Sequence, residues 1–135
     1  MIVVSGAVSA RNTIQQVGIE GALTHPKAEG KLDPSIQLFF GDQAHPAVEK
    51  TYGTWTANKK TNAVGKSDEF ACQWAFISAM MSLQQRASRE GGNAVINIRS
   101  YYYKNDFSSP TEFECGAGAV MAGVTMVGDV VTLAE

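Results

Sequence analysis

Three consecutive residues, Gly65, Lys66 and Ser67, have the types that hold phosphate in a nucleotide-binding loop. In such a loop, backbone N–H groups and the lysine bind phosphates, the hydroxyl binds magnesium, and a second glycine lies five positions earlier. Lys60 occupies that earlier position here. Residues 48–60 are also polar, unlike the apolar run of a buried parallel strand. The segment therefore predicts a loop lysine followed by a helix-capping serine, with nucleotide binding as the less favoured alternative.

The other side chains that could do chemistry are scattered along the chain. A metal site would have to draw on His25, His45, Asp42, Cys72 and Cys115. Both histidines precede prolines and have no ligand partner three to five residues further on, so we expect them in exposed turns. Cys72 falls among apolar residues, where a thiolate is disfavoured. We therefore predict that the protein is not an enzyme and binds no metal or other cofactor.

Cys72 and Cys115 are the two cysteines of the chain, 43 positions apart. Neither belongs to a C-x-x-C pair, so a zinc knuckle or a thioredoxin-type redox motif is disfavoured. A bridge between them would close a loop worth about 4 kcal/mol in the chain-entropy description. An exported location would permit that disulfide. The alternative is two buried free thiols that behave as small hydrophobic residues.

Three tyrosines in a row, Tyr101, Tyr102 and Tyr103, are flanked by Arg99 and Lys104. Such an aromatic run can stack on nucleic-acid bases or sugars. The chain carries a net charge of −2 with its charges dispersed, which argues against nucleic acid as the partner. We therefore interpret the tyrosines as candidates for a protein or oligomer interface, or as aromatics that cover a sheet surface.

Residues 1–10 are apolar or small and carry no charged side chain. They are too few to cross a bilayer, which takes about 20 residues, and we predict no transmembrane segment. Three interpretations stay open: a first β-strand, the end of a secretory signal peptide with a small-residue cleavage pattern at residues 8–10, or a strand donated to a neighbouring subunit. Ile2, Val3 and Val4 are the interface candidates here.

The clearest element is a helix over residues 68–90. Ser67 can cap it, and Asp68 and Glu69 place negative charge in its first turn. Apolar residues form two adjacent stripes at helical spacing, and Gly91-Gly92 ends the helix. The stripes contain Phe70, Trp74, Ile77 and Met81, and Cys72, Phe76, Met80, Leu83 and Ala87. Two stripes indicate a broad buried face, as in a central core helix.

Alternation and turn residues predict strands around this helix. The expected strands are residues 13–19, 35–40, 48–56, 93–103, 111–127 and 130–133. Residues 57–66 and 104–110 are predicted loops, and Gly128-Asp129 a turn. The small residues 115–119 are expected to lie under large helix side chains. The 135 residues, 44% of them hydrophobic, predict a single α+β domain over residues 11–135. Its mainly antiparallel sheet of four to six strands has the long helix on one face.

Three stretches together suggest a family. They read KKTNAVGKSDEFACQWAF, GGNAVINIRSYY and FSSPTEFECGAGAVMAGV, and FGDQAHPAV upstream also fits. They resemble a group of small exported bacterial proteins commonly labelled "excinuclease ATPase subunit". The resemblance implies export. It does not imply an ATPase for this chain, because an excision-repair ATPase is far larger and residues 65–67 are the one nucleotide-like feature.

The order of helix, Gly-x-Asn-Ala-Val strand and hairpin is more distantly similar to two other families. One is the periplasmic domain of the Rcs envelope-stress lipoprotein, which carries two disulfides. Cys72 and Cys115 occupy places comparable to cysteines of that domain, whose other two cysteines have no counterpart here. The other is the putative heavy-metal-binding domain family, whose small α/β modules form ring-like homo-oligomers.

These observations favour a non-enzymatic exported bacterial protein that acts through protein contacts, as a binding module or sensor of the envelope. The periplasm or the extracellular space is its expected location. The alternative is a structural subunit that assembles with copies of itself through its apolar N-terminal strand. A nucleotide- or metal-binding protein is the least favoured hypothesis.

Overall fold

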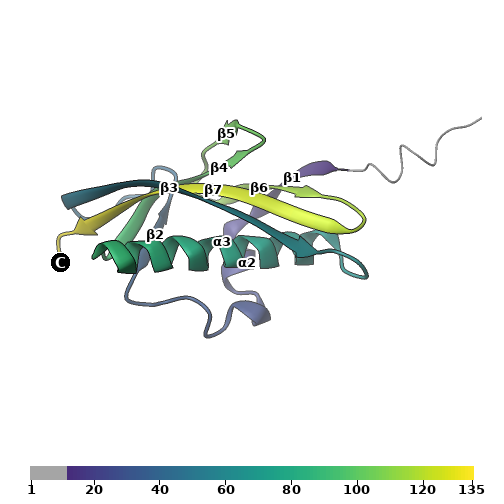
Figure 1. Cartoon of the computed structure of the whole chain (residues 1–135), viewed down its shortest axis with the longest axis horizontal. Helices are drawn as coiled ribbons and strands as arrows, with labels where there is room; N and C mark the ends of the chain where they lie inside the picture. Colours follow the sequence, from purple (N-terminus) through teal and green to yellow (C-terminus); the bar gives the residue numbers. More distant parts are fainter. Residues whose placement is uncertain (1–11) are drawn as a thin grey trace, which may run out of the picture.

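The computed structural model describes residues 12–135. Within them, seven strands form one mixed, mostly antiparallel sheet, and the helix α3 (Asp68–Glu90) lies across one of its faces (Figure 1). The α+β class predicted from the sequence is confirmed, with seven strands where four to six were expected. No helix of residues 12–135 is both long and apolar enough to cross a membrane.

The longest central strand is β7 (Met121–Leu133). One side of β7 pairs over its whole length with β3 (Val48–Asn62), in antiparallel orientation. Two strands share the other side. β6 (Glu112–Ala117) pairs with the beginning of β7, and β4 (Ala94–Tyr102) pairs with its later part. The sheet therefore forks where β4 and β6 meet beside β7.

Three shorter strands complete the sheet. β1 (Thr13–Gly18) runs antiparallel to β6, and β2 (Gln37–Phe40) runs parallel to β4. β5 (Asn105–Phe107) forms a hairpin with the end of β4, and this hairpin stands off the sheet on the side away from α3 (Figure 1). The short helices α2 (Ile19–Leu23) and η1 (Pro26–Ala28) pack against α3.

Local signals set both ends of α3 where the sequence predicts them. The Ser67 hydroxyl accepts a hydrogen bond from the Phe70 N–H at 3.1 Å, and Gly91 adopts the left-handed conformation at φ 92°. The second predicted stripe is fully buried against the sheet. Of the first stripe, only Ile77 is fully buried, because Phe70, Trp74 and Met81 lie at the margin of the contact.

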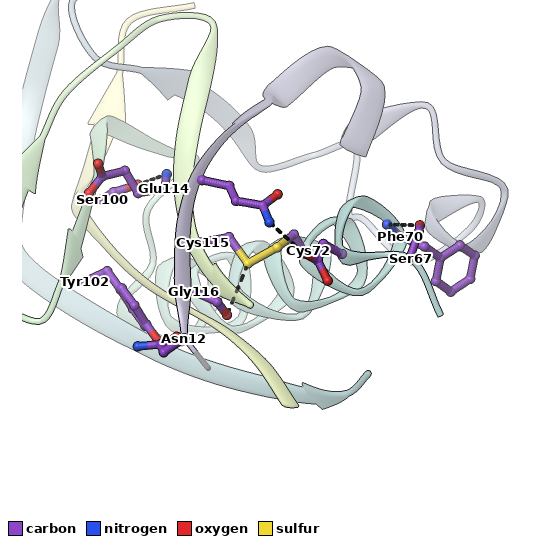
Figure 2. The surroundings of a disulfide bond; sticks show 11 residues. Asn12, Ser67, Phe70, Cys72, Ser100, Tyr102, Glu114, Cys115 and Gly116 are labelled. Atoms are coloured by element: carbon purple, nitrogen blue, oxygen red, sulfur yellow. Dashed lines mark hydrogen bonds between the residues drawn. A yellow bond between two sulfur atoms is a disulfide. The ribbon is translucent and has the colours of Figure 1, made fainter. Parts of the chain in front are cut away.

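A disulfide joins Cys72 of α3 to Cys115 of β6, with both residues fully buried (Figure 2). The predicted bridge is confirmed, and the free-thiol alternative is wrong. The bond ties the first turns of the helix to the sheet beneath them. A buried disulfide of this kind is typical of proteins that fold in an oxidising compartment outside the cytoplasm.

Several predicted strand limits are wrong. The single strand expected over residues 111–127 is two strands, β6 and β7, and the expected turn at Gly128-Asp129 lies inside β7. Gly128 is there because of packing: a β-carbon on it would lie 2.4 Å from Val95 Cγ1 in the core. The expected loop 57–66 is mostly the second half of β3, and the expected loop 104–110 contains β5.

Candidate binding groove on the helix-free face

The fork in the sheet is held by Ser100, the last residue of β4 that pairs with β7. Its hydroxyl accepts the backbone N–H of Glu114 at 2.9 Å (Figure 2). The same hydroxyl lies 3.5 Å from the sulfur of Met126. Ser100 thus satisfies a β6 amide at the point where β4 rises from the sheet. The residues after it, Tyr101 to Tyr103, are carried onto the face opposite α3.

Tyr102 covers two glycines of the underlying strands. Gly116 of β6 is the paired partner of Gly123 of β7. A β-carbon on Gly116 would lie 2.1 Å from the Tyr102 hydroxyl and 2.4 Å from its ring, so the ring occupies the space that a side chain would need. The Tyr102 ring therefore packs on these two glycines, on the face of the sheet opposite α3. The prediction that the small residues 115–119 lie under the helix is wrong for Gly116.

The Tyr102 hydroxyl donates to Asn12 Oδ1 at 3.4 Å, which links the hairpin to the residue before β1 (Figure 2). Partial burial raises the pKa of Tyr102, and the hydrogen bond with Asn12 opposes that rise in part. The phenol therefore stays protonated, as a hydrogen-bond donor, throughout the physiological pH range.

The hairpin turn consists of Tyr103 and Lys104, both with positive φ, 51° and 63°. Two consecutive left-handed residues are what a two-residue primed turn requires, and Asn-Gly is its usual sequence. Each residue with a β-carbon costs roughly 1 kcal/mol or more in this conformation. Backbone strain of this kind concentrates at functional sites. The turn holds the Tyr103 ring out in solvent, 76% exposed.

An open groove of about 820 Å³ lies between this hairpin and β3. Its volume is within the range of known ligand sites. β3 contributes Thr56, Asn58 and Lys60 to the lining, β7 contributes Thr125, and the β6–β7 turn contributes Val120. Val120 is 60% exposed, and the adjacent Met121 is 45% exposed. The groove thus combines aromatic, aliphatic and amide surface, which can bind a partner of mixed character.

Beyond the groove, the same face carries a closed polar network. Asp129 of β7 accepts a hydrogen bond from Thr54 at 2.7 Å and lies 3.8 Å from the Arg99 guanidinium. Arg99 also approaches Asp106 of β5, at 3.9 Å. Arg99 therefore has acidic neighbours on two strands and is not a free cation.

Glu114, the buried carboxylate of β6, is also satisfied within the fold. It accepts the side-chain amide of Gln16 at 2.7 Å and that of Asn105 at 3.0 Å. Both contacts tie β6 to its neighbours, β1 and β5. Glu114 is therefore a structural residue.

The nucleotide-like segment forms a turn between β3 and α3. Gly65 has φ 73°, and the Lys66 ammonium donates to the Asn62 carbonyl at 2.8 Å. Ser67 caps α3, as predicted. The strand before this turn, β3, is an antiparallel strand paired along one side only within residues 12–135, whereas a phosphate-binding loop follows a buried parallel strand.

The candidate metal ligands do not meet. Cys72 and Cys115 are bonded to each other, and no group of three or more His, Cys, Asp or Glu among residues 12–135 could hold a metal ion. His45 is exposed, as predicted, but it lies in the irregular stretch before β3 and not in a turn. His25 does not: it is only 8% exposed and its ring stands edge-on to Phe70 at 4.6 Å. The interface candidates Ile2, Val3 and Val4 lie outside the described residues.

Sequence reasoning found the tyrosines of the groove but missed its opposite wall. Asn58 and Lys60 fell in the stretch expected to be a loop. Their signal was the continued alternation of Thr54, Thr56, Asn58 and Lys60 past residue 56, which is the period of a strand.

Asp33 lies far from the groove, and the hydrogen bonds from Ser35 lower the pKa of its carboxyl.

Comparison of the chain with protein-family models, with curated proteins and with solved structures finds no match.

Proposed function

We propose that the protein is an exported binding module of the bacterial envelope, without enzymatic activity, that acts through protein contacts. The proposed contact surface is the groove between the tyrosine hairpin and β3. Its place of action is the periplasm or the extracellular space, in keeping with the buried disulfide and with the resemblance of its sequence to exported proteins.

The observation that carries this proposal is the strained turn that holds Tyr103 in solvent beside exposed Val120 and Met121. Tyrosine and methionine are enriched at protein interfaces, and exposed apolar side chains that lie together often mark one. The candidate nucleophile Cys72 is consumed in the disulfide. The groove therefore offers contact surface, whereas Cys72, Arg99 and Glu114 are engaged in contacts within the fold.

Site-specific photo-crosslinking tests this proposal. A benzophenone amino acid replaces Tyr103 in one variant and Gln85, exposed on α3, in a matched control. Both are incubated with an envelope extract of the host bacterium. We expect a discrete adduct from position 103 that the control does not form. An excess of wild-type protein without the benzophenone should prevent formation of this adduct. The same excess of the Tyr101→Ser/Tyr103→Ser variant should not prevent it. The same adducts from both positions would overturn the proposal.

The alternative function is self-assembly, and one observation favours it. β1 pairs with β6 only, within the residues that the structure describes, and it exposes Ile14, 45% accessible, near the groove. Such a strand edge can accept another strand. Size-exclusion chromatography with and without residues 1–10 tests this alternative, because assembly that is unchanged by the deletion removes the donated-strand mechanism.

A further inference from the structure

We infer that the groove takes an extended, acidic polypeptide segment of the partner, with carboxylates interspersed among apolar side chains. This inference rests on the function proposed above and names the chemistry of the partner at that same site.

The first argument is charge. The whole chain has more acidic than basic residues, thirteen against eleven. Yet the described lining of the groove contains two lysines, Lys60 and Lys104, and no Asp or Glu. The nearby charged groups are already engaged, Arg99 with Asp129 and Asp106, and Glu114 with two amides. The charged side chains that line the groove are therefore both lysines, so a carboxylate bound in it can pair with Lys60 or Lys104 and meets no acidic side chain in the lining.

The second argument is where the two lysines are held. The Lys60 stem lies across the floor, since a β-carbon on Gly123 would be 3.2 Å from Lys60 Cγ. Lys104 is held in the left-handed turn, and its N–H is bonded to the Tyr101 carbonyl at 3.1 Å. The two cations therefore come from opposite walls, β3 and the hairpin, so one bound segment can contact both.

The third argument separates a polypeptide from other anions. Two lysines are few for nucleic acid, whose binding rests on many phosphate contacts. An acidic polysaccharide offers charge and ring faces but no aliphatic groups to cover Val120 and Met121, which are 60% and 45% exposed. Residues 1–11 of this chain contain Arg11 and no acidic side chain, so they lack the complementary charge. An acidic segment with apolar side chains fits every part of the lining.

A displayed library of random twelve-residue peptides, selected on the full chain, tests this inference. We expect enriched peptides that contain Asp or Glu next to aromatic or aliphatic residues. In fluorescence anisotropy, the best peptide should bind at least tenfold more weakly to Lys60→Gln/Lys104→Gln. Its affinity for the wild type should fall as salt rises from 50 to 500 mM, because salt screens the attraction between exposed charges.

The matched control is Lys59→Gln/Lys31→Gln, which removes the same charge. Lys59 is next to Lys60, but strand alternation turns its side chain to the other face, and neither Lys59 nor Lys31 lines the groove. We expect this control to bind the peptide within twofold of the wild type. Equal thermal unfolding midpoints for both double variants would show that the fold is intact.

The outcomes separate the inference from the proposed function. Peptides that need Tyr103 but show no acidic preference and bind Lys60→Gln/Lys104→Gln normally would overturn the inference and leave the groove as the contact surface. Peptides indifferent to Tyr101→Ser/Tyr103→Ser would overturn both. Failure to select any peptide would overturn the inference. The inference would also be overturned if a hexagalacturonate bound more tightly than the best peptide and lost that binding in Lys60→Gln/Lys104→Gln. Dimerisation of the chain that Lys60→Gln/Lys104→Gln abolishes would overturn it as well.

Discussion

Gly116 and Gly128 show how one residue type serves two purposes in adjacent strands. The space above Gly116 holds the Tyr102 ring at the surface. The space above Gly128 holds core side chains, because a β-carbon added there would lie 2.4 Å from Val95 Cγ1, 3.3 Å from Ile98 Cγ1 and 3.6 Å from Leu83 Cδ1. The first glycine shapes the groove, and the second allows the sheet to pack closely under α3.

We predict different costs for the two alanine substitutions. Gly128→Ala should lower the free energy of unfolding by about 1–3 kcal/mol, because overpacked core side chains must shift. Gly116→Ala should cost less, because Tyr102 at the surface can swing away. It should nevertheless weaken partner binding by disturbing the hairpin. Urea unfolding, monitored by circular dichroism, measures the free energy of unfolding of both variants.

Gly18→Ala serves as the control for both substitutions, because nothing lies within 4 Å of its added β-carbon. It should change the free energy of unfolding by no more than about 0.5 kcal/mol. A Gly116→Ala variant as destabilised as Gly128→Ala would contradict the assignment of the two glycines to opposite faces.

The helix α3 also holds in place the segment that leads into β2. Its buried side chain Gln84 accepts the Asp33 N–H at 2.8 Å and donates to the carbonyls of Asp33, at 2.9 Å, and Ile36, at 2.8 Å. One amide thus satisfies three backbone groups of the segment that leads into β2. This explains how a stretch without regular structure is held along the helix.

Replacing Gln84 with methionine should lower the free energy of unfolding by about 1–3 kcal/mol, since three backbone groups lose their partner. The segment over residues 29–36 should also become the first site of proteolytic cleavage. Urea unfolding and limited proteolysis with mass spectrometry measure the two effects. Gln85→Met, at the exposed neighbouring position, should leave both unchanged, and equal effects from the two variants would argue against this role.

For the molecule as a whole, the disulfide is a cross-link between the helix layer and the sheet. The sequence separation of 43 residues gives a stabilisation of about 4 kcal/mol in the chain-entropy description. We predict that reduction lowers the free energy of unfolding by about 2–4 kcal/mol. Chemical denaturation with and without a phosphine reductant measures it, and the Cys72→Ala/Cys115→Ala variant should not respond to the reductant. Two thiols that alkylate in native, unreduced protein would contradict the bond.

The features that could be read from the chain are those encoded by neighbouring residues. α3 begins and ends as predicted because Ser67, the acidic first turn, the 3.6-residue spacing and Gly91 act within a few positions of one another. The α+β class and the buried positions of Cys72 and Cys115 follow from the same periodicity, whereas their pairing was favoured by an exported location. Tyr101 to Tyr103 stood out because consecutive aromatics near charges are uncommon in a solvated strand.

What could not be read are the contacts between distant segments. Nothing local indicates that β3 pairs with β7, or that β4 leaves β7 at Ser100 so that β6 can take its place. Gly116, Gly123, Lys60 and Tyr102 become one groove because of these pairings. A strand pattern specifies which side chains share a face, whereas the neighbour on each edge is chosen by the total surface that the folded chain buries.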